Sequence, residues 1–277
     1  MMLKPDYPVQ VICEVLEVAR SSVYYTKAKT DETALKKAIE RLAGDWVTYG
    51  YRRLTQMLHR EGWMVNHKRV RRVMQEMGLL QKRVRSNPRT TNSQHSYGRY
   101  PNRVQDLVIT YPDQVWVADI TYVRLGQGHV YLAIIMDVYT RTIRGWQLSR
   151  NLDAQSLTVS ALQRALAHHC PIIHHSDQGW QYACTDYVQL LTNNAVQISM
   201  AKVGEPRENG YAERLMRTLK EEEIDLSEYL DFTDAYHRIG YFIEAVYNIK
   251  RIHSSIGYLT PCEFEEHYHQ QQVQLVH

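Results

Sequence analysis

A buried strand with a carboxylate at its centre is predicted by the run Val115-Trp116-Val117-Ala118-Asp119-Ile120-Thr121-Tyr122-Val123. The run is rich in β-branched and aromatic residues, which favour strands. Because side chains alternate between the faces of a strand, Asp119 shares a face with Val117 and Thr121. Carboxylates are rarely buried unless they are paired or bind a metal. Asp119 is therefore either a hydrogen-bonded core residue or part of a site.

The residues around this run predict a sheet that is covered by helices. Three strands are expected over 114–123, 129–139 and 142–149, with a hairpin at 125–128. A helix over 153–168, a strand over 171–174, a helix over 185–192 and a strand over 196–200 should follow. Helices over 208–223 and 232–250 complete the pattern. This order predicts an α/β fold, a mixed sheet flanked by helices.

The first part of the chain is basic and helical. Residues 1–110 hold 20 Lys and Arg against 10 Asp and Glu, and the remainder holds 13 against 20. Helices are expected over 30–43, from Leu54 onward, and over 67–77, where Asn66 is the N-cap and Gly78 ends the helix. A glycine turn before a basic helix is the helix-turn-helix pattern.

Residues 50–90 hold 11 Lys and Arg against 2 Asp and Glu, which favours binding to DNA phosphates over a merely solvated basic face. The candidate DNA contacts are Arg52, Arg53, Lys68, Arg69, Arg71 and Arg72. We expect residues 1–29 to be a helix-turn-helix remnant, 30–83 an all-α DNA-binding domain, 84–106 a basic linker, and 107–270 a catalytic core with C-terminal helices.

Composition excludes several classes of protein. The longest apolar run, residues 130–136, is too short to span a bilayer. The four cysteines are scattered, which indicates a reducing compartment. Charges interrupt the N-terminal residues, so we expect no signal peptide and a cytoplasmic, nucleoid-associated protein. His168, His169, Cys170, His174, His175 and Cys184 could suggest zinc, but adjacent strand residues point to opposite faces.

Two further carboxylates favour the interpretation that Asp119 is part of a site. Asp177 follows a predicted strand, and Glu213 lies in a predicted helix, where alone it would be an ordinary surface ion pair with Arg217. Three carboxylates that converge need cations or raised pKa values. Oxygen ligands favour Mg²⁺ or Mn²⁺, and two such ions about 3.5–4 Å apart suit phosphoryl transfer.

Three co-ordered motifs point to one family. They are Trp116-x-x-Asp119-Ile120-Thr121-Tyr122, His175-Ser176-Asp177-x-Gly179-x-x-Tyr182, and Asn209-Gly210-x-Ala212-Glu213 with Leu219-Lys220. Thirty-five residues separate Asp177 from Glu213. With this D,D-35-E signature the chain resembles the second-reading-frame transposases (OrfB) of the IS-three family of bacterial insertion sequences, which share the retroviral integrase catalytic core. Glu208 stands where many relatives have Asp, which keeps the negative charge.

The resemblance extends over nearly the whole chain. Tyr49-Gly50-Tyr51-Arg52-Arg53 through Gly78-Leu79 is similar to the family's second helix-turn-helix. The segment Tyr247-Asn248-x-x-Arg251-x-His253-Ser254-x-x-Gly257-Tyr258-x-Thr260-Pro261 is similar to its C-terminal motif, where we expect Arg251 and His253 to be structural. The resemblance implies a ribonuclease-H-like fold with Asp119, Asp177 and Glu213 as ligands of two metal ions.

The resemblance also implies roles for residues around the carboxylates. Lys202, Arg207, Arg217 and Lys220 are candidate contacts to phosphates of the DNA end, the alternative being an ordinary solvated surface. His175 and Asn209 would support the carboxylates from behind. Tyr182 and Trp180 could stack on an unpaired base or pack in the core.

The function expected is that of a DNA transposase. It would cleave one strand at each end of its element, at the terminal inverted repeats, and transfer the 3′-OH into target DNA. Because two ends must meet, at least a dimer is expected on DNA, and the first-reading-frame protein is an expected partner or fusion. The alternatives are a DNA-binding regulator with a non-catalytic core and a general ribonuclease-H-like nuclease, which would not need so basic a helical domain.

Overall fold

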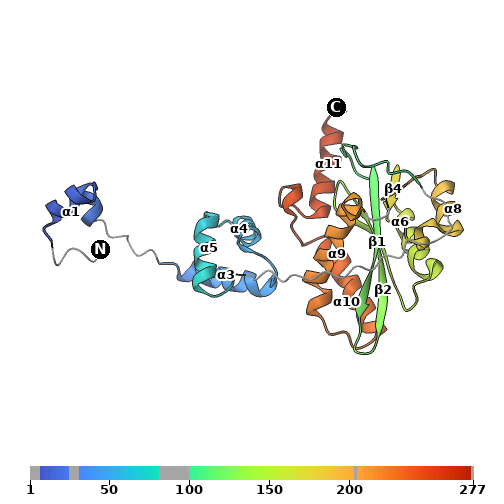
Figure 1. Ribbon diagram of the computed structural model, residues 1–277, viewed down its shortest axis with the longest axis horizontal. Helices are drawn as coiled ribbons and strands as arrows, with labels where there is room; N and C mark the ends of the chain where they lie inside the picture. Colours follow the sequence, from blue (N-terminus) through green and yellow to red (C-terminus); the bar gives the residue numbers. More distant parts are fainter. Residues whose placement is uncertain (1–6, 25–30, 81–99, 203–204, 276–277) are drawn as a thin grey trace.

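The helical domain comes first in the structure. The computed structural model describes residues 7–24, 31–80, 100–202 and 205–275. Two short helices, α1 (Val9–Val15) and α2 (Arg20–Tyr24), are followed by α3 (Thr33–Asp45), α4 (Tyr51–Arg60) and α5 (His67–Glu76). We call residues 31–80 the helix-turn-helix module (Figure 1). Most of the predicted linker, 84–106, lies outside the described residues.

The module has its own apolar core, formed by residues on one side of each of its three helices. These residues are Leu35, Ile39 and Leu42 of α3, Leu54 and Leu58 of α4, and Val70, Val73 and Met74 of α5. The Asn66 side chain accepts a hydrogen bond from the Lys68 backbone N–H at 2.8 Å, which caps α5 as predicted. Gly62 and Gly78 have φ angles of +85° and +71°, so each turn uses a conformation that favours glycine.

Five strands form one mixed sheet in the order β3-β2-β1-β4-β5 (Figure 1). β1 (Val115–Arg124), β2 (His129–Asp137) and β3 (Ile143–Ser149) pair antiparallel. β4 (Ile173–Ser176) and β5 (Gln197–Met200) continue the sheet parallel to β1. The run that begins at Val115 is therefore the central strand. The predicted α/β fold, a mixed sheet flanked by helices, is confirmed.

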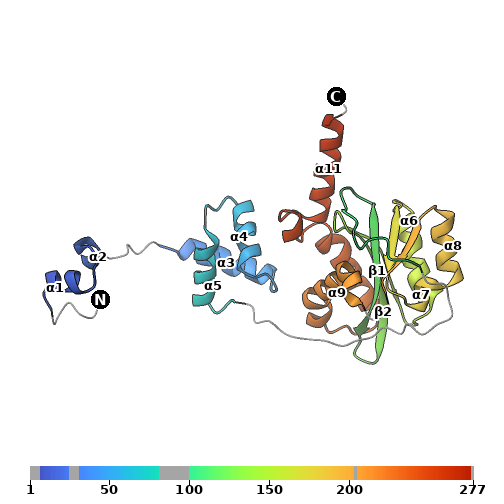
Figure 2. The ribbon, with the colours of Figure 1, turned by 45° about the horizontal axis from the view of Figure 1, so that its top comes forward.

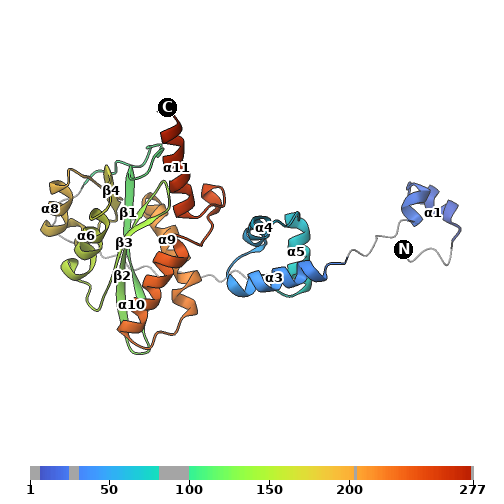
Figure 3. The same ribbon diagram turned by 180° about the vertical axis from the view of Figure 1, so that it is seen from behind.

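Helices cover both faces of this sheet (Figure 3). One face carries η1 (Ala154–Val159), α6 (Ser160–Leu166), α7 (Trp180–Ala183) and α8 (Thr185–Asn193). The other carries η2 (Pro206–Asn209), α9 (Gly210–Glu222), η3 (Ile224–Leu226), α10 (Phe232–Tyr241) and η4 (Phe242–Tyr247). The chain then forms η5 (Ser254–Ile256) and α11 (Pro261–Leu275). None of the helices in the described part of the chain is long and apolar enough to cross a bilayer.

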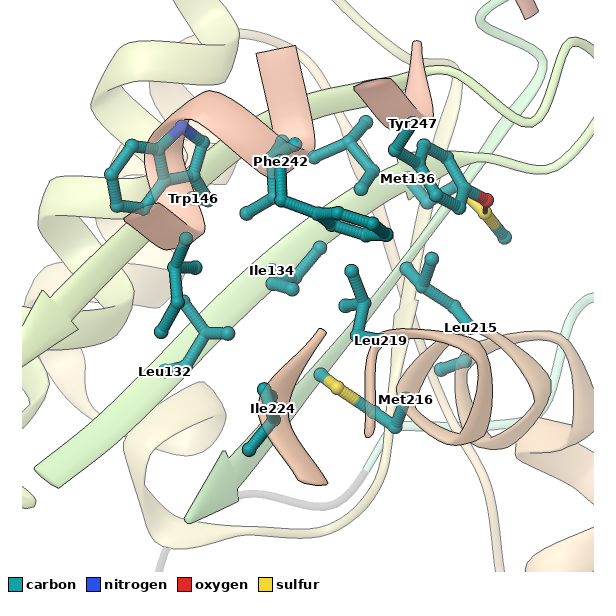
Figure 4. Packing of buried hydrophobic residues seen from close by; sticks show 14 of the residues in the cluster. Leu132, Ile134, Met136, Trp146, Leu215, Met216, Leu219, Ile224, Phe242 and Tyr247 are labelled. Carbon is teal, nitrogen blue, oxygen red and sulfur yellow. Dashed lines mark hydrogen bonds between the residues drawn. The ribbon is translucent and has the colours of Figure 1, made fainter. Parts of the chain in front are cut away.

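Packing on the α9 face holds that helix against the sheet. Figure 4 shows Leu215, Met216 and Leu219 of α9 in the same apolar layer as Leu132 and Ile134 of β2. All five side chains are buried in one apolar cluster. Burial of this stripe fixes the rotation of α9 about its axis, so the polar side of the helix faces away from the core.

Two predicted α-helices contain π-helical turns instead. The predicted helix 153–168 begins with the π-helix η1, and the predicted helix 232–250 changes from α10 to the π-helix η4. In η1 the Thr158 and Ser160 hydroxyls donate to the carbonyl oxygens of Ala154 and Gln155, and such bonds compete with the regular helical ladder. β4 begins two residues later than predicted, beyond Pro171, which lacks a backbone N–H to donate to a ladder.

Candidate active site

The strand β1 places Asp119 at the middle of the sheet. Its Oδ1 accepts a hydrogen bond of 2.8 Å from the Ile120 backbone N–H. The pKa of Asp119 is raised to about 7, chiefly by burial and then by the negative charge of Asp177 and, more weakly, of Glu213. The Ile120 hydrogen bond and the charge of Lys220 act in the opposite direction. Asp119 is thus a partly buried carboxylate among like charges.

The parallel pairing of β1 and β4 brings Asp177 to the same level of the sheet. Val117 lies opposite His175 in this ladder, and Asp119 and Asp177 each follow two residues later. Asp177 lies just beyond the end of β4, and its Oδ1 accepts a 2.9 Å hydrogen bond from the Gly179 backbone N–H. A Cβ at Gly179 would lie 3.0 Å from that oxygen, so glycine leaves room for the carboxylate in this turn.

Glu213 reaches the site from the first turn of α9. The neighbouring Ala212 and Leu215 are buried, whereas Glu213 is exposed and lies close enough to Asp119 to raise its pKa. Lys220, two turns further along α9, is half-buried and also near Asp119. Carboxylates of β4 and α9 thus both lie close enough to Asp119 to raise its pKa, and Lys220 lies close enough to lower it.

The ligand atoms of Asp119, Asp177 and Glu213 do not all lie within 4.8 Å of one another. Among the described residues, the only group of three or more His, Cys, Asp or Glu whose ligand atoms all lie within 4.8 Å is Asp113, His169 and Glu265. That group surrounds the buried Arg144, which donates to Asp113 Oδ1 at 2.9 Å and to Glu265 Oε1 at 2.6 Å. We interpret it as an arginine ion-pair network, because a guanidinium already occupies the place where a cation would bind.

His175 anchors the start of α9 and cannot serve as a metal ligand in this arrangement. Its Nε2 lies 3.1 Å from the Glu208 carbonyl oxygen, which only accepts, so this nitrogen carries the proton. Nδ1 then accepts from the Ser199 hydroxyl at 2.8 Å. Burial is the main cause that lowers the pKa of His175. Because both nitrogens are engaged, the ring ties β4 and β5 to the residue before Asn209.

Asn209 contacts the backbone of Ala118, the residue before Asp119. It is 5% exposed, and its Nδ2 donates to the Ala118 carbonyl oxygen at 3.4 Å, while its buried Oδ1 has no hydrogen-bond partner among the described residues. Tyr182 is 2% exposed and lies near both aspartates. Burial is the main cause that raises the pKa of Tyr182 well above 10, and the charges of Asp119 and Asp177 raise it further. Such burial excludes stacking of Tyr182 on an unpaired base, so the core-packing alternative holds for this residue.

The predicted phosphate contacts near the carboxylates differ in their surroundings. Arg217 is exposed on α9, one turn beyond Glu213. Lys202 is exposed and lies 3.8 Å from Glu208 Oε1, and the Lys202 backbone N–H donates to Glu208 Oε2 at 2.8 Å. The Arg207 side chain lies outside the described part of the structure.

The helix-turn-helix module separates its predicted DNA contacts into two groups. Arg69 and Arg72 donate to Glu32 at 2.8 and 2.6 Å, and Arg53 donates to Glu222 at 3.0 Å. Arg52, Lys68 and Arg71 are exposed and have no ion pair with any described carboxylate. Arg52 and Arg71 each lie 5.7 Å from the centre of the Tyr51 ring, which joins α4 and α5 on that side.

Comparison with known proteins identifies the two parts of the chain. The HTH-like domain profile matches residues 30–87, and two integrase core domain profiles match residues 110–206 and 194–261. The chain is similar to the HTLV-2 integrase catalytic core domain in complex with magnesium (TM-score 0.39, 15% identity, 56% of this chain and 97% of that chain). A simian T-cell lymphotropic virus intasome in complex with PP2A regulatory subunit B56 gamma also matches (TM-score 0.49, 18% identity, 82% and 74%).

Curated relatives match over much more of the chain. The insertion element IS600 uncharacterized 31 kDa protein of Shigella sonnei is 36% identical, with 94% of this chain and 99% of that protein covered. The transposase for insertion sequence element IS904 of Lactococcus lactis is 35% identical (79% and 88% covered). Transposase InsF for insertion sequence IS3A of Escherichia coli is 30% identical (94% and 94% covered).

A helix-turn-helix-like domain followed by an integrase core defines a polynucleotidyl transferase that acts on DNA. The chain belongs to the second-reading-frame transposases of the IS-three family of bacterial insertion sequences. The family assignment and the transposase function predicted from the three motifs are thus confirmed.

Proposed function

We propose that Asp119, Asp177 and Glu213 are the catalytic carboxylates of this transposase and bind two divalent cations, Mg²⁺ or Mn²⁺. The supporting observation is the register of β1 and β4, in which Asp119 and Asp177 each follow two residues after the paired Val117 and His175. The negative charges of Asp177 and of Glu213, in the first turn of α9, both raise the pKa of Asp119, although like charges repel.

The donor set fits a hard cation. All three side chains offer oxygen atoms only. The backbone N–H groups of Ile120 and Gly179 each donate a hydrogen bond to one oxygen of Asp119 and Asp177, respectively, which orients the two carboxylates. Asp119 would be shared by the two ions, with Asp177 on one ion and Glu213 on the other, an arrangement that does not require all three carboxylates to lie within 4.8 Å of one another.

The bound ions would stabilise the charge that develops on the attacking and leaving oxygens of an in-line phosphoryl transfer. Water would attack the phosphorus at the element's end, and the bond from phosphorus to the 3′ oxygen would break to release a 3′-OH. That 3′-OH would then attack a phosphorus of target DNA, and the bond from this phosphorus to the target's 3′ oxygen would break and leave a 3′-OH on the target strand. Lys202, Arg207, Arg217 and Lys220 would contact phosphates of the bound strand, since Arg217 and Lys220 lie on the same helix as Glu213.

The partners proposed are the element's terminal inverted repeats, target DNA and further copies of this chain. A transposition complex must hold two DNA ends together, so at least a dimer should assemble on DNA. The first-reading-frame protein of the same element, free or fused, would complete recognition of the ends.

Replacement of Glu213 by glutamine tests the catalytic assignment. Glu213→Gln should lower Mg²⁺-dependent cleavage of a duplex carrying the element's end by roughly 100-fold or more, because an amide is a weaker ligand for a hard cation. Glu221→Gln, which changes an exposed carboxylate on the same helix, should cleave like the wild type. Equal activities of the two variants would contradict the assignment. If the wild-type chain binds DNA but does not cleave it, this result would support the alternative function, a DNA-binding regulator with a non-catalytic core.

The exposed basic group on α4 and α5 should carry the electrostatic part of DNA binding. Arg71→Ala should reduce the slope of log affinity against log salt concentration by about 0.9, the loss of one phosphate contact. Arg72→Ala should change that slope little, because Arg72 already pairs with Glu32 and Glu76. Fluorescence anisotropy with a nonspecific duplex over a range of salt measures both. A larger change for Arg72 than for Arg71 would place the DNA on another face.

A further inference from the structure

The segment of residues 251–263, which overlaps the C-terminal motif, supplies part of the module's apolar core. Ile252 is fully buried in the same cluster as Leu54 and Leu58 of α4, and Tyr258 packs against that cluster. Figures 1 and 2 show the module on the side of the core that carries α9. The module is therefore seated on the catalytic domain through a side chain that completes its core.

Directional hydrogen bonds accompany this apolar contact. The Ile252 backbone N–H donates to the Tyr49 hydroxyl oxygen at 3.2 Å. Arg60 at the end of α4 donates to the Tyr258 carbonyl oxygen at 2.9 Å and to both carboxylate oxygens of Glu263 at 2.9 and 2.7 Å. These hydrogen bonds join residues about 200 positions apart in the chain and specify one orientation of the module.

A buried ion-pair cluster connects the module to α9. Glu222, in the last turn of α9, accepts hydrogen bonds of 2.6 Å from Arg251 to each of its oxygens, and Arg53 donates to Oε1 at 3.0 Å. Burial raises the pKa of Glu222, but the hydrogen bonds and charges of Arg251 and Arg53 outweigh it and lower the pKa on balance. Arg251 and Glu222 are 3% and 7% exposed, whereas Arg53 is 21% exposed. Arg53 is thus the accessible member of the cluster.

Adjacent arginines of α4 face different surroundings. Arg52 is exposed beside Tyr51 and Arg71, on the side assigned above to DNA. Arg53 lies 4.9 Å from the Tyr49 ring centre and points to Glu222. One side of the module is therefore available to DNA, and the other is occupied by the catalytic domain.

We propose that residues 251–263 and Glu222 form a docking platform for the chain's own helix-turn-helix module, and that Arg53 is a positioning residue at this contact rather than a DNA contact. Docking fixes the recognition helix α5 relative to α9, which carries Glu213 at its other end. DNA held by the module is thereby presented to the carboxylates at a defined distance. This coupling rests on the proposed function, but the docking itself does not.

Arg53→Ala and its neighbour Arg52→Ala form a matched pair for the test in the full chain. In Arg53→Ala, hydrogen exchange at the Ile252 amide should accelerate on the order of tenfold, the effect of losing one hydrogen bond to a charged group. The radius of gyration from small-angle scattering should increase. For Arg53→Ala the slope of log affinity for DNA against log salt concentration should match that of the wild type. Cleavage at the element's end should fall roughly 10- to 100-fold, because the module no longer holds the DNA in the correct position relative to the carboxylates.

Arg52→Ala should show the reverse pattern, with unchanged exchange at Ile252 and a salt slope reduced by about 0.9. Tyr49→Phe gives a second variant, which removes the acceptor for the Ile252 N–H but keeps the ring; Tyr51→Phe is its control. Tyr49→Phe should also accelerate exchange at Ile252. Unchanged exchange in both Arg53→Ala and Tyr49→Phe, or a reduced salt slope in Arg53→Ala, would overturn the proposal. Exchange and scattering report docking even if the chain proves catalytically inactive.

Discussion

Asp119→Asn is expected to abolish both strand cleavage and strand transfer, with a loss of roughly 1,000-fold or more, because the ligand shared by the proposed ions would lose its charge. Asparagine has nearly the same shape as aspartate and can still accept the hydrogen bond from the Ile120 N–H. The fold should therefore persist. Affinity for DNA should stay within about twofold of the wild type, because the proposed phosphate contacts are basic residues that the substitution leaves in place.

Gel assays on labelled element ends, with Mg²⁺ or with a chelator, measure cleavage and transfer, and anisotropy measures binding. Asp186→Asn, in an exposed carboxylate of the first turn of α8, is the control and should be fully active. Loss of DNA binding together with catalysis in Asp119→Asn would refute the separation of the two roles. Retained cleavage would remove Asp119 from the catalytic centre.

The second large effect concerns stability against pH in the absence of divalent cations. The folded-state pKa of Asp119 is about 7, above its ordinary value of 3.8. Between these values the folded protein binds a proton at Asp119 that the unfolded chain has lost, so this residue makes the free energy of unfolding fall as pH rises from 4 to 7. The upper limit of the effect is about 4 kcal/mol, from about three pKa units.

The wild-type curve also contains histidine contributions of the opposite sign. Burial, as the main cause, lowers the pKa of His174 to about 3 and of His253 to about 2, so both favour the folded state increasingly as pH rises toward 6.5. The difference between Asp119→Asn and the wild type isolates Asp119. Urea unfolding from pH 4.5 to 8 should show the variant gaining stability relative to the wild type up to pH 7. Mg²⁺ should raise the free energy of unfolding of the wild type only. Parallel plots of the free energy of unfolding against pH for the two proteins would contradict the raised pKa of Asp119.

Much of the architecture is readable in the local pattern of the chain. The β-branched run around Asp119, the glycine turn at Gly78 and the cap at Asn66 each specify an element through interactions between near neighbours. Spacing of the three carboxylate motifs predicts the family. Residue alternation and helical periodicity also show which side of each element is apolar, and these apolar sides face the cores of the structure.

The sequence alone does not show which residues contact each other when they lie far apart in the chain. Arg52 and Arg53 are chemically identical neighbours, and only the fold shows that Arg53 meets Glu222, 169 residues away. Tyr182 suits base stacking or a core equally well until its burial is known. Asp113, His169 and Glu265 have no motif, and Arg144 brings them together. Local pattern determines elements and their apolar sides, because those depend on neighbours in sequence. Partners across the chain depend on how the elements pack, and the tertiary structure decides them.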